Sequence, residues 1–289
     1  MPPLNFTGAA NMDYQNILVH LDASKAMPQR METALQIAMR FNARLTGLFN
    51  VFQPPVAPLS MITAPPEYRF TSEKLRAEYQ DAEEAMFRKE LARVGLDGDW
   101  NFSTLPPNFA MPKAARLADL VVAGQYDPED PESFIAEQFV ENLVLSSGRP
   151  VLLVPYAGRF PDVGDTICVA WDGSREASRA LHDALPFLVR ARKVIIFSVN
   201  ASGDTDGPRI ESDQIAAAVA RHGANVVTEE VDGVRDVSAG NMLLSRAADF
   251  GADMIVMGCY GHARWRELFL GGVTRTILQS MTVPVLLSH

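Results

Sequence analysis

The stretch that decides the fold occurs twice, as NILVHLDAS at residues 16–24 and as TICVAWDGS at residues 166–174. In each copy, a short apolar run ends in an aspartate that is followed two residues later by a serine. Several matching segments in the same order indicate an internal repeat. Two further pairs of segments match in that order: ADLVVAG at 118–124 with ADMIVMG at 252–258, and PVLL at 150–153 with PVLL at 284–287.

Short apolar runs alternate with helical patterns in both copies. Uninterrupted apolar strands are typical of a parallel sheet that is covered on both faces. Met31, Leu35 and Ala38 share one helical face, and a longer charged segment, Glu73–Val94, predicts a helix outside the sheet. The predicted fold is α/β, with two tandem doubly wound parallel-sheet (Rossmann-like) domains. The predicted strands are Ile17–Leu21, Leu45–Val51, Leu120–Ala123, Val151–Val154, Ile167–Trp171, Val194–Val199, Met254–Met257 and Val285–Leu287.

The domain boundaries follow from the repeat. We expect residues 1–12 to form a flexible tail, residues 13–157 to form the first domain and residues 163–289 to form the second. The first copy is longer in its middle, and a proline-rich loop, Gln53–Phe70, accounts for part of the excess. The terminal strands of the two copies both follow a proline, which suits an edge strand. The two edges can pair with each other inside one chain, and association into a homodimer stays open.

Composition excludes several classes of protein. The chain has 289 residues, of which 47% are hydrophobic and 21% charged, and its net charge is −9. This charge argues against a nucleic-acid binder and against binding to anionic membranes. No apolar run is long enough for a membrane span, and the first residues lack the features of a secretion signal. Only two cysteines occur, far apart in the sequence, so we expect buried thiols in a cytoplasmic protein.

The residues after the strands carry the candidate chemistry. Asp172 could accept hydrogen bonds from an amino group or a ribose hydroxyl, or it could cap the next helix together with Ser174. Glycines near the end of the chain could bring backbone N–H groups close to phosphate at a helix N-terminus, or they could simply form turns. These glycines are Gly258, Gly261, Gly271 and Gly272, and Thr274 follows them. Trp171 points away from Asp172 by strand alternation, which favours core packing.

The Gly-x2-Gly-x9-Gly spacing from Gly258 to Gly271, with Asp172 after the first strand, resembles the universal stress protein family. This chain has Gly272 where the family pattern has Ser or Thr. The family includes proteins that bind ATP and proteins that bind no nucleotide. The resemblance implies an adenine site, a ribose and phosphate site, and Mg²⁺ held only through the phosphates of ATP. The implied site residues are Ala170, Asp172 and Val199 for adenine, and Met257, Gly258, Tyr260, Gly261, Gly271, Gly272, Val273 and Thr274 for ribose and phosphate.

The two copies differ in charge at the expected phosphate loop. Residues 127–141 contain six acidic and no basic residues, whereas the matching residues 261–275 contain three arginines and one glutamate. Phosphate would be repelled in the first copy and attracted in the second. We therefore expect one nucleotide per chain, in the second copy, with a degenerate motif in the first.

Three functions fit these patterns. The first is a cytoplasmic, ATP-binding universal-stress-type protein that acts as a nucleotide-dependent regulator of a stress response. The second is a nucleotide-free protein, built as an internal pseudo-dimer, that binds protein partners. The third is an adenine-nucleotide hydrolase or transferase. No catalytic or protein-bound metal site is readable from the motifs, so the chain is at most a slow ATPase.

Overall fold

The computed structural model describes residues 13–50, 66–130, 139–200, 210–232, 237–260 and 272–289. The predicted tail 1–12 and most of the predicted loop Gln53–Phe70 lie outside these ranges. The elements of the first half are β1 (Asn16–Leu21), α1 (Met27–Phe41), β2 (Arg44–Asn50), α3 (Pro66–Val94), β3 (Gly98–Ser103), α4 (Pro107–Ala115), β4 (Leu120–Gly124), α5 (Phe139–Ser147) and β5 (Val151–Val154).

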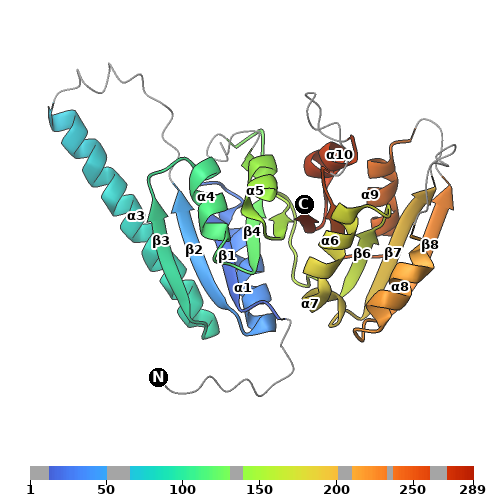
Figure 1. Ribbon diagram of the computed structural model, residues 1–289. Coiled ribbons are helices and arrows are strands. Elements are labelled where there is room, and N and C mark those ends of the chain that lie inside the picture. Colours follow the sequence, from blue (N-terminus) through green and yellow to red (C-terminus); the bar gives the residue numbers. More distant parts are fainter. Residues whose placement is uncertain (1–12, 51–65, 131–138, 201–209, 233–236, 261–271) are drawn as a thin grey trace.

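The second half repeats the alternation of strands and helices (Figure 1). Its elements are β6 (Thr166–Ala170), α6 (Arg175–Asp183), α7 (Leu185–Leu188), β7 (Lys193–Asn200), α8 (Ser212–Ala220), β8 (Val226–Asp232), α9 (Ala239–Asp249), β9 (Met254–Gly258), α10 (Gly272–Ser280) and β10 (Val285–Ser288). All strands lie in one ten-stranded sheet in the order β3-β2-β1-β4-β5-β10-β9-β6-β7-β8. Within each half every pairing is parallel. The predicted α/β class and the two tandem halves with parallel strands are confirmed, and the two halves share one sheet.

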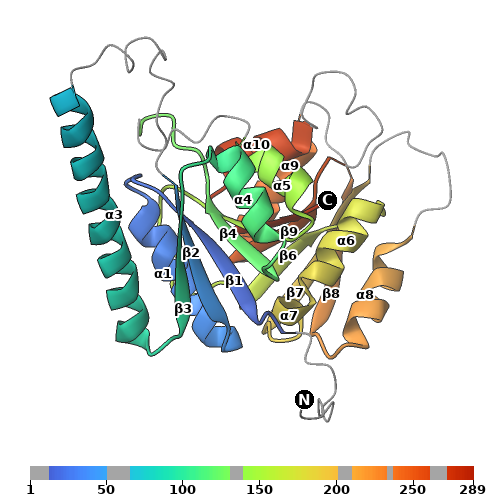
Figure 2. The same cartoon turned by 60° about the vertical axis from the view of Figure 1, so that its left-hand side comes forward.

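Several predicted boundaries are wrong. The third strand of each half, β3 and β8, was not predicted, because neither forms an uninterrupted apolar run: β3 alternates between apolar and polar residues, and β8 has three polar residues in its middle. Helix α3 begins at Pro66, inside the predicted loop, and Trp171 lies one residue beyond β6. Helix α3 flanks β3 at the outer edge of the molecule (Figures 1 and 2), and its Phe87 is fully buried.

The two halves meet at an antiparallel seam. Strand β10 pairs with β5, with Leu286 opposite Leu152, so the two edge strands that follow a proline pair inside the chain as expected. All other strands keep the orientation of their own half, and so the seam relates the halves by an approximate two-fold axis. Gln125, just after β4, adds a side-chain bond by donating from Nε2 to the carbonyl oxygen of Leu278 in α10, at 2.9 Å.

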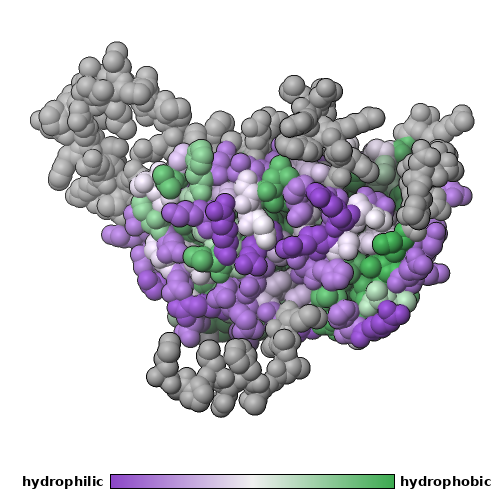
Figure 3. All heavy atoms as spheres, in the orientation of Figure 1, coloured by the Kyte–Doolittle hydropathy of each residue, from purple (hydrophilic) through white to green (hydrophobic). Residues whose placement is uncertain are grey.

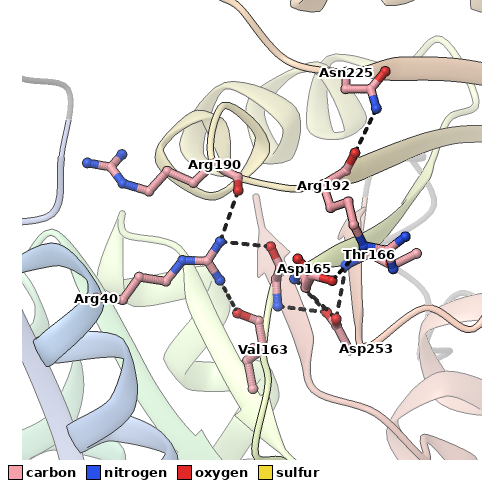
Figure 4. Close-up of polar contacts among 9 residues, drawn as sticks. Arg40, Val163, Asp165, Thr166, Arg190, Arg192, Asn225 and Asp253 are labelled. Atoms are coloured by element: carbon pink, nitrogen blue, oxygen red, sulfur yellow. Dashed lines mark hydrogen bonds and ion pairs between the residues drawn. The ribbon is translucent and has the colours of Figure 1, made fainter.

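A second contact between the halves lies at the start of β6 (Figure 4). Arg40, in the last turn of α1, donates to the carbonyl oxygens of Val163 at 2.6 Å and Gly164 at 3.0 Å. Arg190, its counterpart 150 residues later, forms an ion pair of 2.5 Å with Asp13, just before β1. Each half therefore uses an equivalent arginine to hold the segment that leads into the first strand of the other half.

The repeat extends to individual hydrogen bonds. The carboxylate of Asp119 accepts from the backbone N–H groups of Gln15 and Asn16, where β1 begins. Asp253, 134 residues later, accepts in the same way from Gly164, Asp165 and Thr166, where β6 begins (Figure 4). The aspartate that the two matching segments share thus has one structural role in both halves.

The surface is mixed in character. On the face in Figure 3, hydrophilic residues cover much of the described surface, and hydrophobic patches lie between them. Among the described residues, no helix is both long and apolar enough to cross a membrane.

Candidate functional site

Asp172 stands at the carboxyl end of β6, directly before α6. Its Oδ1 accepts from the backbone N–H of Ser174 at 3.0 Å, and the Ser174 hydroxyl caps α6 by accepting from Ala177 N at 3.1 Å. The capping role that the sequence allowed for Ser174 is therefore present. The Asp172 side chain is exposed, and its second oxygen accepts no hydrogen bond from the described part of the chain. This oxygen is available to a ligand.

Half of the other ten expected site residues lie on one side of the sheet. Five apolar ones pack in or against the hydrophobic cluster on the side of α9 and α10: Ala170, Val199, Met257, Tyr260 and Val273. Trp171 belongs to the cluster on the opposite face, and its indole N–H donates to the carbonyl oxygen of Ile210 at 3.0 Å. Core packing of Trp171 is confirmed, and Ala170 and Val199 lie at the carboxyl ends of the neighbouring strands β6 and β7.

Gly258 is the last residue of β9, and it packs against the first turn of α6. A Cβ atom there would overlap the backbone of Glu176 and Ala177, in the first turn of α6. Glycine at this position is therefore required by helix packing, whatever ligand the site takes. The same packing places Asp172 and the start of α6 next to the end of β9.

Tyr260 follows Gly258 and Cys259 in a strained conformation. Its φ of 60° lies in the left-handed region that side chains other than glycine rarely adopt. Its hydroxyl is buried without a hydrogen-bond partner among the described residues. Burial raises the pKa of Tyr260 well above its usual value, and the Glu141 carboxylate of the first half raises it further. The phenol therefore stays neutral, and it lies at the boundary between the two halves.

Of the residues expected to bind phosphate, the structure describes only some. Gly261 and Gly271 lie outside the described residues, as do three of the charged residues of the loop, Arg264, Arg266 and Glu267. Gly272 is the first residue of α10 and has open space where a Cβ would be, whereas Thr274 is buried. The described end of the loop thus reaches a helix N-terminus, as expected.

The equivalent site in the first half is filled by its own side chains. Asp22, the counterpart of Asp172, is buried, and its Oδ1 accepts from Ser24 Oγ and Arg30 Nη2, each at 2.5 Å. Arg30 is only 2% exposed although it carries a charge. Burial by itself would raise the pKa of Asp22, but the Arg30 guanidinium, His20 and the Ser24 hydroxyl together hold this pKa below its usual value. The counterpart of Arg30 in the second half is Ala180.

The Arg30 side chain also separates α1 from the end of β4. A Cβ at Gly124 would overlap Arg30 Nη1, whereas the equivalent Gly258 faces helix backbone directly. The N-terminus of α1 is occupied as well, because Asp130 accepts from Lys25 N at 2.7 Å. A carboxylate from the acidic segment 127–141 thus accepts from the backbone N–H beside this helix N-terminus, where an anionic ligand would otherwise bind. Glu132, Glu137 and Gln138 of that segment lie outside the described residues.

His20, the counterpart of Ala170, adds a buried imidazole to this cluster. Its Nδ1 lies 3.6 Å from Asp22 Oδ2, and its ring packs on Phe139 of α5 at 5.0 Å. Burial lowers the pKa of His20 to about 4, although the Asp22 carboxylate opposes this shift. The imidazole is therefore neutral near pH 7.

Acid should destabilise the protein through His20. Its pKa in the folded state lies below the unfolded value of about 6.5, so stability is complete above pH 6.5 and is lost as the pH falls toward 4. We expect this residue alone to lower the unfolding free energy by roughly 3 kcal/mol at pH 4. Urea unfolding from pH 7 to 4 should show a smaller loss for His20→Leu than for wild type. Replacing the exposed His182 with Gln should leave the loss unchanged, and an equal loss in His20→Leu would contradict this role.

The described residues give little support for a metal site or a reactive cysteine. No group of three or more His, Cys, Asp or Glu side chains there could hold a metal ion. Cys168 and Cys259 are both buried free thiols, and burial raises the pKa of Cys168 to about 12. Neither thiol is a nucleophile at neutral pH.

Sequence reasoning missed three residues that shape the two sites. Arg30 and His20 fill the first site, and the unpredicted strand β8 places Val231 beside Val199 in the second. Arg30 carried a signal in the sequence, because a lone arginine beside the apolar face of a helix needs a buried partner. Val231 carried none, since its strand was not recognised.

Comparisons with known proteins give one family match and several structures of similar fold. The model of the universal stress protein family matches residues 164–289. No curated protein matches the sequence. A universal stress protein from Archaeoglobus fulgidus DSM 4304 is 18% identical, with a TM-score of 0.70, over 96% of this chain and 98% of that chain. A functionally unknown protein from Pseudomonas aeruginosa PAO1 is 16% identical, with a TM-score of 0.61, over 96% and 93%.

At such low identity these two structures show a shared fold, which extends over both halves of the chain. The family match is specific to the half in which Asp172 is exposed. Residues 164–289 are therefore the part of the chain that matches the universal stress protein family.

Proposed function

We propose that the second half binds one adenine nucleotide per chain, with ATP as the ligand, and that the first half binds none. One observation carries this proposal. Asp172 is exposed at the end of its strand, whereas the equivalent Asp22 is sealed by a buried arginine. The same fold thus offers an open carboxylate in one half and a closed ion pair in the other.

The residues of the second half fit the parts of an adenine nucleotide. Ala170 and Val199 would contact the base, and Asp172 would accept hydrogen bonds from an amino group or a ribose hydroxyl. Gly271 to Thr274, at the N-terminus of α10, would hold the phosphates through backbone N–H groups. ATP would bring its own Mg²⁺ through these phosphates. The nucleotide would then regulate the protein in a cytoplasmic stress response.

Calorimetric titration with ATP tests the stoichiometry. We expect about one ATP per chain for the wild type, and at least tenfold weaker binding for Asp172→Ala, because a hydrogen bond to a charged group contributes about 1.5–3 kcal/mol. Asp249→Ala removes an exposed carboxylate at the far end of α9 and should bind like the wild type. Two ATP per chain, or unchanged affinity in Asp172→Ala, would contradict the proposal.

The nucleotide-free alternative has one observation in its favour. Packing against α6 explains Gly258 without any ligand. In that case the internally paired halves would serve as a scaffold for protein partners. Mass spectrometry of small molecules released from the purified, denatured protein separates the two functions, because a co-purified adenine nucleotide would exclude the alternative.

A further inference from the structure

An apolar strip crosses the carboxyl ends of three neighbouring strands in the second half. It consists of Ala170 on β6, Val199 on β7 and Val231 on β8, all only partly buried and all packed against the cluster on the α9 side. Val199 and Val231 are direct register partners. The three strands lie side by side (Figure 1), so the strip runs from Asp172 to the edge of the sheet.

The equivalent positions in the first half are polar. They are held by His20, Asn50 and Ser103, of which Asn50 and Ser103 are register partners on β2 and β3. Asn50 is buried, and its amide donates to the carbonyl oxygen of Leu105 at 3.2 Å. The half that is closed by Arg30 has thus no apolar strip, while the half with the open carboxylate has one.

We propose that Val231 is a specificity-determining residue that selects a purine base. This inference rests on the proposed nucleotide function and deepens it. Neighbouring strands lie about 4.8 Å apart, so a strip across three strands is about 10 Å wide. A two-ring base with its edge at Asp172 extends over Val199 to Val231, whereas a one-ring base ends before it reaches Val231. Contact with Val231 therefore favours purines over pyrimidines.

The test compares two valines on one strand. Val231→Ser copies the first half, and Val227→Ser alters a valine on the same face of β8 that is 42% exposed and lies toward the amino end. Titrations of the full chain with ATP and with CTP should show ATP binding about fivefold weaker in Val231→Ser, the effect of losing roughly one apolar contact. Binding of CTP should stay within about twofold of wild type. Val227→Ser should match the wild type with both nucleotides.

The isosteric Val231→Thr keeps the shape and strand preference of valine, and it should weaken ATP binding in the same direction if Val231→Ser folds poorly. The thermal midpoint of each variant reports folding. Equal ATP affinity in Val231→Ser and Val227→Ser, or an equal loss for ATP and CTP, would overturn the inference while the proposed function stands. A wild-type protein that binds neither nucleotide would overturn the proposed function itself.

Discussion

Replacing Arg30 with alanine is expected to destabilise the protein by about 3–5 kcal/mol, the usual effect of removing one partner from a buried ion pair. The change leaves the Asp22 carboxylate buried without its cation, and it opens a gap between α1 and the end of β4. Urea unfolding at pH 7 measures the loss. The matched control is Arg44→Ala, because Arg44 pairs with Asp99 on the surface, where both side chains are about half exposed. This control should stay within about 1 kcal/mol of wild type.

A double-mutant cycle identifies the cause. Asp22→Ala combined with Arg30→Ala should be less destabilised than the sum of the single variants, since no unpaired charge stays buried. Additive effects would show that Arg30 acts by filling space and not by pairing. A loss in Arg30→Ala as small as that in Arg44→Ala would contradict the buried ion pair altogether.

The second large effect is expected for Gly258→Ala. The added methyl group would overlap the backbone of α6, which cannot move as a flexible side chain can. We expect a loss of about 1–3 kcal/mol in unfolding free energy, typical of overpacking in a tight core. Binding of ATP should also weaken, because Asp172 lies just before α6 and would move with it. Chemical unfolding and ATP titration of the same preparation measure both effects.

Gly272→Ala is the matched control, since Gly272 belongs to the same motif but has open space around it. Its stability should be unchanged or higher by up to about 1 kcal/mol, because alanine favours a helix. Any loss of ATP binding in this variant would therefore come from a changed contact with ATP and not from lower stability. If Gly258→Ala were as stable as Gly272→Ala, the packing role of Gly258 would be wrong.

Much of the fold follows from local sequence. Apolar runs located eight of the ten strands because those strands are buried on both faces, and the repeated aspartates 119 and 253 make equivalent bonds in both halves. Strands β3 and β8 were not predicted because each lies at an edge of the sheet and is partly exposed, so neither consists of an uninterrupted apolar run. Ala170, Asp172 and Val199 could be proposed as adenine residues because they lie at or just after strand ends that the repeat indicates.

Local sequence could not predict which of the two aspartates is closed by a side chain and which is exposed. Asp22 and Asp172 occupy matching positions in the repeat. Each is followed two residues later by a serine, and a helix begins shortly after that serine. Only the packing of α1 shows that Arg30 reaches Asp22, and only the register of β7 and β8 shows that Val199 meets Val231. The charge difference between the two loops indicated the same asymmetry from the sequence, but for a different part of the site.

The sequence by itself therefore determined the repeat, the α/β alternation, the location of eight strands and the motif of the second half. These depend on burial patterns and on residues that are close in the chain. The tertiary structure decided that one ten-stranded sheet joins the halves, that the first site is closed by its own arginine and that the second keeps an exposed carboxylate beside an apolar strip. These depend on contacts between residues far apart in sequence, which form only when helices and strands pack.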